Sequence, residues 1–285
     1  MKIQILFYLL LLSQVFLLSW YLPKVIQKRM QYIFNNYSFE EYPKLYGGSL
    51  EKTQKNYRRH VLFNDIMIIV GILLIAALIF FADRLSSGLV MMIVFFYGMT
   101  QAIPVIVMDI AMMRHCKKLR DEDQRTERKA ELVPRSIFNH ISMAEIIVVV
   151  FFYIAACTFD MYTKSFDTSL GAELYEAVII LTLTNLFFIG LIRWRVYGKK
   201  LNPYLDNKDN NKELDTIVKS AQYTSIAVSL FLIAMRAVNV YDLEQLEGAV
   251  MSIYLQCIFF FGILQSIKKM KIEDINFEAF RADAS

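Results

Sequence analysis

Long apolar runs alternate with polar segments along the chain. Seven such runs cover residues 3–22, 61–82, 89–113, 141–161, 175–194, 221–240 and 249–267. A helix needs about 20 apolar residues to cross the hydrocarbon core of a bilayer. The pattern therefore predicts an all-α, multi-pass membrane protein with seven transmembrane helices. The fifth and sixth runs are less uniform than the others, because Thr182, Thr184, Asn185 and Arg236 interrupt them.

The composition favours lipid as the environment of these runs. Of the 285 residues, 56% are hydrophobic, and the mean hydropathy is +0.39, whereas soluble domains are only about 45–50% apolar. Lys2 precedes the first run, as a positive charge precedes the apolar part of a signal peptide. However, residues 20–23 read WYLP and offer no small-residue cleavage site. We expect residues 1–22 to remain as a membrane anchor.

Basic residues are distributed unevenly among the connections. Four segments hold most of the Lys and Arg residues, with eight in 23–60, eight in 114–140, six in 195–220 and four in 268–281. The alternate connections hold one in 83–88, one in 162–174 and none in 241–248. Because basic connections stay in the cytoplasm, this pattern predicts an external N-terminus and a cytoplasmic C-terminus. In a bacterium the membrane would be the inner one.

The net charge of +4 does not indicate a nucleic-acid partner. A basic cytoplasmic face is explained by membrane insertion and by attraction to anionic lipid headgroups. The partners that the sequence predicts are therefore the lipid bilayer and a protein, which includes self-association. A small solute is a further possibility, considered below with the acidic residues.

After the anchor, the chain divides into three helical hairpins that we interpret as parallel repeats. Their entry points recur every 80 residues, at His60, His140 and Ser220. The predicted organisation is an anchor, a basic Tyr-rich cytoplasmic segment, a first repeat, a second repeat with a preceding charged helix, a third repeat and a cytoplasmic tail, at 1–22, 23–60, 61–120, 121–200, 201–271 and 272–285.

Polar residues inside the apolar runs or at their ends are the first candidates for function, because burying such groups in a membrane is costly. His60 and His140 each stand five residues before a carboxylate, and residues five apart point about 140° apart on a helix. Neither pair can hold a metal alone, since chelation from one helix needs positions i and i+4. We expect no cofactor. The candidate polar membrane cluster comprises His60, Asp65, Gln101, Asp109, His140, Glu145, Asn185 and Arg193.

Asp65 and Asp109 carry the transport hypothesis. They belong to the same predicted hairpin, and neither span contains an arginine to neutralise them. Two carboxylates at one depth would raise each other's proton affinity, as a proton-coupled small-solute permease requires. Pro104 precedes Asp109 by five residues and could free a backbone carbonyl there. The alternative is that both acids meet headgroups separately.

A tyrosine-rich segment carries the leading hypothesis. Residues 30–58 lie between the first two spans, on the predicted cytoplasmic side. Interfacial aromatics are common at headgroup level, and aromatics also anchor protein interfaces. We therefore expect a non-catalytic membrane component or scaffold that docks a partner on its cytoplasmic face. The candidate docking residues are Tyr32, Tyr37, Tyr42 and Tyr46.

Motifs of known enzymes are missing from the sequence. It contains no phosphate-binding Walker loop, no G-x-S-x-G, no H-E-x-x-H and no glycine-rich dinucleotide turn. An intramembrane enzyme or metal site built from scattered residues is the third and weakest reading, and we expect no catalytic activity.

Overall fold

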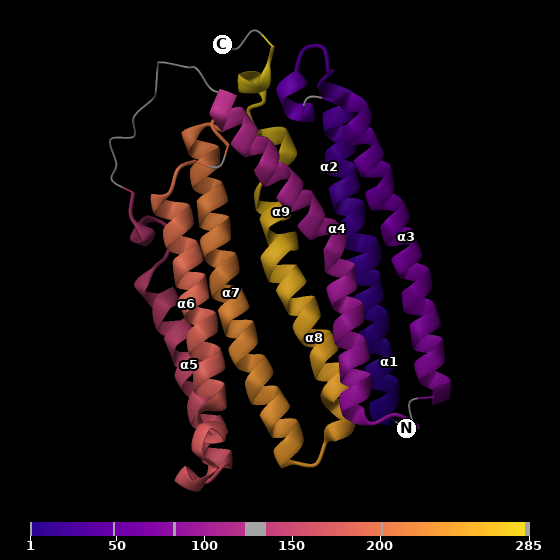
Figure 1. Ribbon diagram of the computed structural model, residues 1–285, viewed down its shortest axis with the longest axis vertical. Helices are drawn as coiled ribbons and strands as arrows, with labels where there is room; N and C mark the ends of the chain where they lie inside the picture. The colour runs from indigo at the N-terminus through magenta and orange to yellow at the C-terminus, as the bar shows by residue number, and fades with distance from the viewer. Residues whose placement is uncertain (1, 48, 82–83, 123–134, 201, 283–285) are drawn as a thin grey trace.

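Helices make up almost the whole structure (Figure 1). The computed structural model describes residues 2–47, 49–81, 84–122, 135–200 and 202–282, and within these ranges it contains no strand. The long helices are α1 (Lys2–Gln14), α2 (Leu22–Asn36), α3 (Leu50–Phe81), α4 (Ser87–Glu122), α5 (Met143–Thr163), α6 (Glu176–Tyr197), α7 (Asn207–Val240) and α8 (Glu247–Phe259). A π-helical turn, η1 (Val15–Tyr21), joins α1 to α2, and another, η7 (Phe260–Leu264), joins α8 to α9 (Gln265–Lys269).

Short 3₁₀ turns lie in the connections and in the tail. They are η2 (Pro43–Tyr46), η4 (Ile137–Asn139), η5 (Thr168–Tyr175), η6 (Glu244–Leu246), η8 (Ile272–Asp274) and η9 (Glu278–Phe280). The turns η5 and η6 connect consecutive spans at one end of the bundle (Figure 1). The turns η2, η8 and η9 lie near the other end, where η2 contacts η9.

Seven helical segments are long and apolar enough to cross a membrane, as the sequence predicts. Several extend well beyond the apolar run at their centre. The first continues through η1 and α2 to Asn36, and α3 begins at Leu50 rather than near position 61. The extra turns are polar, so these helices project past the bilayer at one end. The charged helix predicted ahead of the second hairpin falls largely on residues 123–134, outside the described residues.

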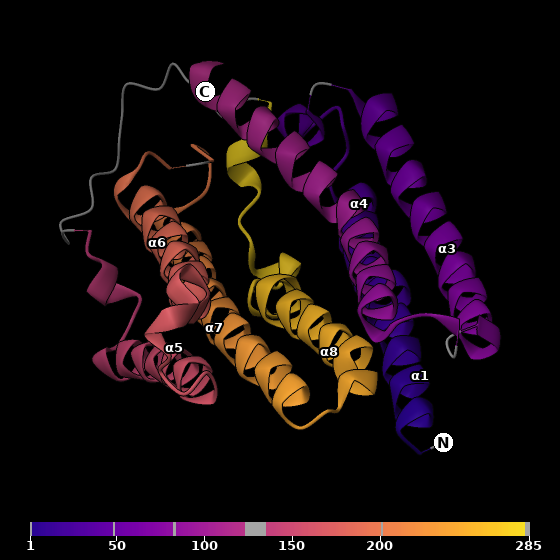
Figure 2. The ribbon, with the colours of Figure 1, turned by 60° about the horizontal axis from the view of Figure 1, so that its bottom comes forward.

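The helices pack as two groups (Figures 1 and 2). One group contains α1, α3, α4 and α8, with α4 and α1 packed mainly on α8 and the turn η1 packed on α3. The other contains α5 and α6, each packed mainly on α7. The two groups meet where α7 lies along α8, and there Phe231 stacks on Tyr254 with ring centroids 4.2 Å apart.

The threefold hairpin repeat is not confirmed by this packing. Residues 80 positions apart occupy different places in their helices, since His60 lies inside α3 whereas His140 precedes α5. Within the first predicted hairpin, α4 packs more extensively on α8 than on its neighbour α3. Packing across the bundle, rather than between consecutive spans, dominates the first group.

Two glycines allow the helices of the first group to approach closely. A Cβ atom on Gly71 of α3 would lie 2.2 Å from the Tyr97 hydroxyl oxygen, and one on Gly98 of α4 would lie 2.5 Å from Leu255 Cδ1. A side chain at Gly71 would force the Tyr97 ring and Val15 to move, and one at Gly98 would force the end of the Leu255 side chain to shift. Small residues in this role are typical of membrane helix interfaces.

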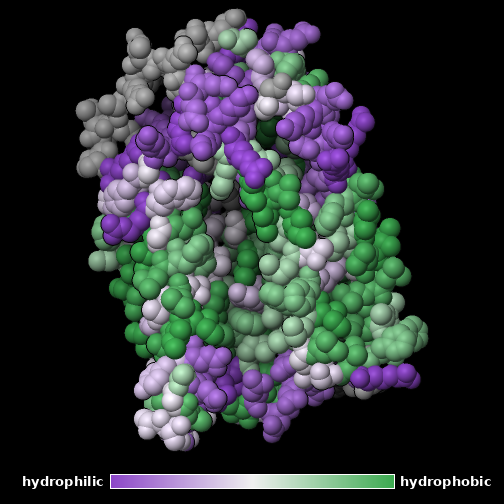
Figure 3. Space-filling view, in the orientation of Figure 1, coloured by the Kyte–Doolittle hydropathy of each residue, from purple (hydrophilic) through white to green (hydrophobic). Residues whose placement is uncertain are grey.

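On the face seen in Figure 3, a broad apolar band lies between polar ends, and exposed large apolar side chains on α1, α3, α4, α5 and α6 extend it into an apolar belt. Phe80 is 77% exposed and Phe187 is 66% exposed, although both are large aromatic residues. A protein surface of this kind needs lipid to cover it. We call the end that carries η2, the 198–206 connection and the tail the basic end, and the opposite end, with η5 and η6, the acidic end.

Candidate functional site

The main candidate site is an aromatic cluster at the basic end of the bundle, beyond the apolar belt. Tyr42 is 7% exposed and Leu119 is 5% exposed, with Tyr204 at 9% and Tyr32 and Tyr37 half-buried around them. These five residues come from the 32–46 segment, the last turns of α4 and the connection after α6. We call them the aromatic platform.

The C-terminal tail, residues 272–282, lies on this platform. Phe277 meets the Tyr37 ring edge to face, with centroids 4.8 Å apart, and Phe280 packs against Tyr204 at 5.7 Å. Phe277 and Phe280 are 8% and 4% exposed, and Ile272 is also buried. The tail therefore supplies the apolar side chains that fill the platform.

Polar contacts fix the position of the tail on either side of its aromatic residues. The Tyr42 hydroxyl donates a hydrogen bond to Glu278 Oε1 at 3.1 Å, and the Ala282 backbone N–H donates to the Glu41 carbonyl oxygen at 2.8 Å. The tail begins at a capped helix end, because Arg29 Nη1 donates to the carbonyl oxygens of Ile267 and Met270 at the end of α9. The tail is therefore held by hydrogen bonds to a side chain, that of Tyr42, and to the main chain, at Glu41.

A basic side chain lies at the platform. Lys44 Nζ lies 4.8 Å from the centre of the Tyr204 ring, in a cation–π contact. The backbone carbonyl of Lys44 is 2.7 Å from His115 Nε2, so the η2 turn is tied to the end of α4. The tail, residues 272–282, carries three acidic residues and one basic residue, Arg281, which pairs with Glu278 at 3.7 Å. Its net charge is negative and thus complementary to the basic end on which it lies.

Three tyrosines at or beside the platform, Tyr37, Tyr42 and Tyr46, have raised pKa values. Burial raises the pKa of Tyr42, and the hydrogen bond to Glu278 and the charge of that carboxylate add to the increase. Burial is also the main reason that the pKa values of Tyr37 and Tyr46 are raised. Tyr46 is 3% exposed, and its hydroxyl donates to the Tyr37 carbonyl oxygen. All three phenols favour the neutral form.

The sequence singled out the four tyrosines but not what covers them. Tyr42 and Tyr46 are buried within the chain itself, and Tyr32 and Tyr37 are half-buried. Phe277, Phe280 and Tyr204 were missed by the sequence reasoning. A signal was present, since Phe277 and Phe280, three positions apart, are the two aromatic residues of the 272–285 segment.

A second candidate feature is a chain of buried amides within the apolar belt. Gln14 Nε2 donates to Gln101 Oε1 at 3.0 Å, and Gln101 Nε2 donates to Ser19 Oγ at 2.8 Å. All three side chains are at most 3% exposed. Gln14 directly precedes the π-helical turn η1 and Ser19 lies within it, and such turns are frequent at functional sites. Gln101 was a predicted site residue, whereas Gln14 and Ser19 were not, although both interrupt an apolar run.

The two predicted histidine motifs lie apart, in different helix groups. His60 belongs to α3 and is 6% exposed, and neither of its ring nitrogens has a hydrogen-bond partner. His140 precedes α5, and its Nδ1 lies 2.5 Å from Asp215 Oδ1 of α7. Within the described ranges, no group of three or more His, Cys, Asp or Glu side chains could hold a metal ion.

Asp65 and Asp109 do not form an enclosed pair, since both side chains are exposed on the outside of the bundle. Their depths also differ. Tyr97 of α4 lies opposite Met67 and Gly71 of α3. Counted from this contact along antiparallel helices, Asp109 lies six to ten residues nearer the basic end than Asp65, roughly 9–15 Å.

The remaining predicted site residues have structural partners or face outward. Glu145 forms a capping box with Ser142 at the start of α5, because its Oε2 accepts from the Ser142 backbone N–H at 2.8 Å. Asn185 Oδ1 accepts from Ser225 Oγ at 2.6 Å, which joins α6 to α7. Arg193 is exposed on α6. The predicted cluster of eight is therefore spread over the bundle.

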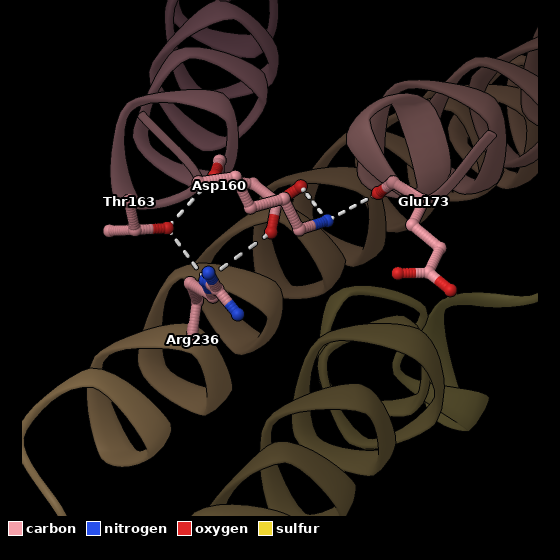
Figure 4. A network of polar contacts seen from close by, with 5 residues as sticks. Asp160, Thr163, Glu173 and Arg236 are labelled. Carbon is pink, nitrogen blue, oxygen red and sulfur yellow. Dashed lines mark hydrogen bonds and ion pairs between the residues drawn. The ribbon is translucent and has the colours of Figure 1, made fainter. Parts of the chain in front are cut away.

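The acidic end carries an ionic network that the sequence reasoning did not identify (Figure 4). Asp160 of α5 lies 2.8 Å from Lys164 Nζ and 3.7 Å from Arg236 Nε of α7. Arg236 Nε also donates to Thr163 Oγ1 at 2.6 Å, and Lys164 Nζ donates to the Glu173 carbonyl oxygen at 2.5 Å. One carboxylate thus serves two cations and joins α5, η5 and α7.

Comparisons of the chain with protein-family models, curated proteins and solved structures found no match in any of the three. A proposal of function therefore depends on the sequence pattern and on the geometry described above.

Proposed function

We propose that this chain is a non-catalytic, multi-pass membrane protein that docks a protein partner at its basic end, through the surface formed by the aromatic platform and the tail. The observation that carries the proposal is the platform itself. Its residues come from parts of the chain far apart in sequence, yet they pack together outside the apolar belt, where lipid burial gives no reason for such order. Aromatic residues are enriched in protein interfaces, which have a polar rim.

The proposed partner is reached through the exposed residues beside the platform. Ser38 and Glu40 are exposed, whereas Tyr42 is buried beneath the tail. A photo-crosslinking amino acid at Ser38 or Glu40 in native membranes is expected to capture a specific protein. The same probe at Tyr42 should capture this chain's own tail in molecules that have no partner bound. A probe at Phe187, in the apolar belt, should capture lipid.

Capture of lipid alone from Ser38 and Glu40 would contradict the docking proposal, because those positions would then lie against headgroups. Crosslinks of equal yield from all four positions would also contradict it, since a docked partner touches one end of the bundle.

The proposal includes the orientation that the charge pattern predicts, with the basic end in the cytoplasm. Reporter fusions after residues 40, 125 and 208 should all give a cytoplasmic reading. A fusion after Asp167, in the acidic-end connection between α5 and α6, should give an external reading and is the matched control. An external signal at 40 or 208 would reverse the proposed topology.

A proton-coupled permease has less support. Its essential pair, Asp65 and Asp109, is exposed and separated in depth, and charge coupling falls with distance over a screening length of about 8–10 Å.

A further inference from the structure

The tail makes the kind of contacts that a bound peptide makes. It supplies two aromatic side chains three positions apart, Phe277 and Phe280, both almost fully buried. It adds one carboxylate, Glu278, which accepts from the Tyr42 hydroxyl, and one backbone N–H, from Ala282. Buried aromatic anchors with polar contacts around them define short-peptide recognition.

The segment is held at one end and separable from the bundle. Arg29 caps the end of α9 at Ile267 and Met270, and the tail then crosses to the platform through short 3₁₀ turns rather than a continuous helix. The tail can therefore leave the platform without disturbing the capped helix end. Opening one segment locally costs less free energy than unfolding the whole chain.

The charge of the tail also identifies what the platform selects. Residues 272–282 carry three acidic residues, Glu273, Asp274 and Glu278, against one basic residue, Arg281, and Lys44 lies at the Tyr204 ring that receives Phe280. An incoming segment of the same chemistry would meet the same favourable field. A basic or purely apolar segment would not.

We propose that the aromatic platform is a peptide-binding site that residues 272–282 occupy in cis, and that the partner of the docking surface displaces them with a short acidic segment bearing two aromatic residues three positions apart. This inference depends on the proposed docking function and specifies the chemistry of its partner. The tail then acts as a built-in competitor that sets the threshold for docking.

The direct test measures binding of a synthetic peptide to the full chain in detergent micelles. The probe is a fluorescein-labelled peptide of residues 271–282. In the Phe277→Ala/Phe280→Ala variant the tail no longer fills the platform, so the peptide should bind about tenfold more tightly than to the unaltered chain, given a tethered effective concentration in the millimolar range and a peptide Kd near a tenth of that. The same peptide with both phenylalanines replaced by alanine should not bind.

A third substitution ties binding to the platform. Adding Tyr204→Ala to the double variant removes the ring that receives Phe280, and peptide binding should then be lost. Equal affinity for the unaltered chain and the double variant, or binding that survives Tyr204→Ala, would overturn the inference.

A locked tail provides a test that does not depend on removing aromatic residues. The 2.8 Å bond between the Ala282 N–H and the Glu41 carbonyl brings these two main chains within reach of a disulfide. In the Glu41→Cys/Ala282→Cys variant, oxidation should abolish peptide binding and reduction should restore it. Binding that is identical in the oxidised and reduced forms would overturn the inference.

The two proposals can fail separately. If Ser38 and Glu40 crosslink to a protein but no variant binds the peptide, docking stands and the peptide mechanism is wrong. If the double variant binds the peptide but membranes yield only lipid crosslinks, the platform is a site for this chain's own tail alone. In the second case, a dimer between a disulfide-locked chain and an unlocked chain would show that the tail of a second copy occupies the platform.

Discussion

The hydroxyl of Tyr97 in α4 donates a hydrogen bond to the backbone carbonyl oxygen of Met67 in α3, at 2.9 Å. The phenol reaches this carbonyl across Gly71, one helical turn further along α3. The bond and the glycine therefore form one unit, in which the absence of a side chain on α3 makes room for the tyrosine of α4.

Gly71→Ala should destabilise the bundle by about 1–3 kcal/mol, the range for overpacking a tight core. The new methyl group would lie 2.2 Å from the Tyr97 hydroxyl oxygen. Tyr97→Phe alone should cost about 0.5–1.5 kcal/mol, the net value of a hydrogen bond. The double variant should cost less than the sum, since part of the clash disappears with the hydroxyl. Thermal unfolding in detergent measures all three.

Gly190→Ala is the matched control, because nothing lies within 4 Å of a Cβ atom at that position. Its melting temperature should equal or slightly exceed that of the unaltered chain. Additive costs in the double variant would show that Tyr97 and Gly71 do not act together.

Gln101→Leu should destabilise the first helix group by about 1–3 kcal/mol, because it leaves Gln14 Nε2 and Ser19 Oγ buried without their partner. Gln14→Leu/Gln101→Leu should recover part of that loss, since one orphaned group is removed with its partner. Thr100→Val on the same helix is the control, because Thr100 is half-buried and its hydroxyl donates to the Phe96 carbonyl oxygen of its own helix. Equal losses of stability in Thr100→Val and Gln101→Leu would show that the buried network contributes no more to stability than the local bond of Thr100.

The ionic network at the acidic end predicts an asymmetry between two substitutions. Asp160→Asn leaves Lys164 and Arg236 without their shared carboxylate, whereas Arg236→Gln leaves the 2.8 Å pair of Asp160 and Lys164 intact. We expect a loss of about 2 kcal/mol for Asp160→Asn, between the values for exposed and buried pairs, and a loss of at most half that for Arg236→Gln. Chemical unfolding monitored at several pH values between 6 and 8 would measure both, and the reverse order would show that Arg236 carries the network.

Alkaline pH should release the tail. Burial and Glu278 raise the pKa of Tyr42, and burial raises those of Tyr37 and Tyr46. Because the folded pKa exceeds the unfolded value of about 10, the stabilising contribution is fully present below pH 10 and is lost as the pH rises through the folded pKa. An environment-sensitive fluorophore on Ala282→Cys should report the release.

Tyr42→Phe keeps the ring and removes one titrating hydroxyl. The release of the tail at alkaline pH should therefore be smaller than in the unaltered chain. Release of the tail between pH 6 and 8 would contradict this account, since no tyrosine named here titrates in that range.

The number of spans could be predicted from sequence, but the rotation of each helix could not. Asn64 is 3% exposed, while the next residue, Asp65, is exposed. Both stand in the same apolar run, and a helix that is apolar on all sides gives no hydrophobic face from which to assign either residue. The sequence therefore located the spans, whereas it did not show which side of each helix faces the bundle.

Long-range pairing was also beyond the sequence pattern. Tyr42 was a predicted docking residue, yet its partner Glu278 lies 236 positions away. The apolar runs likewise defined only the bilayer part of each helix. The polar turns of α3 from Leu50 onward continue the helix, because residues such as Glu51 and Lys52 are good helix formers that need no lipid.

The first span finds its partner in the last one. Leu10 of α1 accepts hydrogen bonds from Gln256 and Ser252 of α8, and 246 positions separate Leu10 from Gln256. At about 5–20 residues per second, a ribosome needs roughly 12–50 s to make that length of chain. During biogenesis α1 is therefore synthesised long before α8, and it lies in the membrane without this partner until most of the protein has been made. Ser13, one turn along the same helix, donates to the same carbonyl at 2.8 Å, so the waiting helix carries a local partner for Leu10 until α8 arrives.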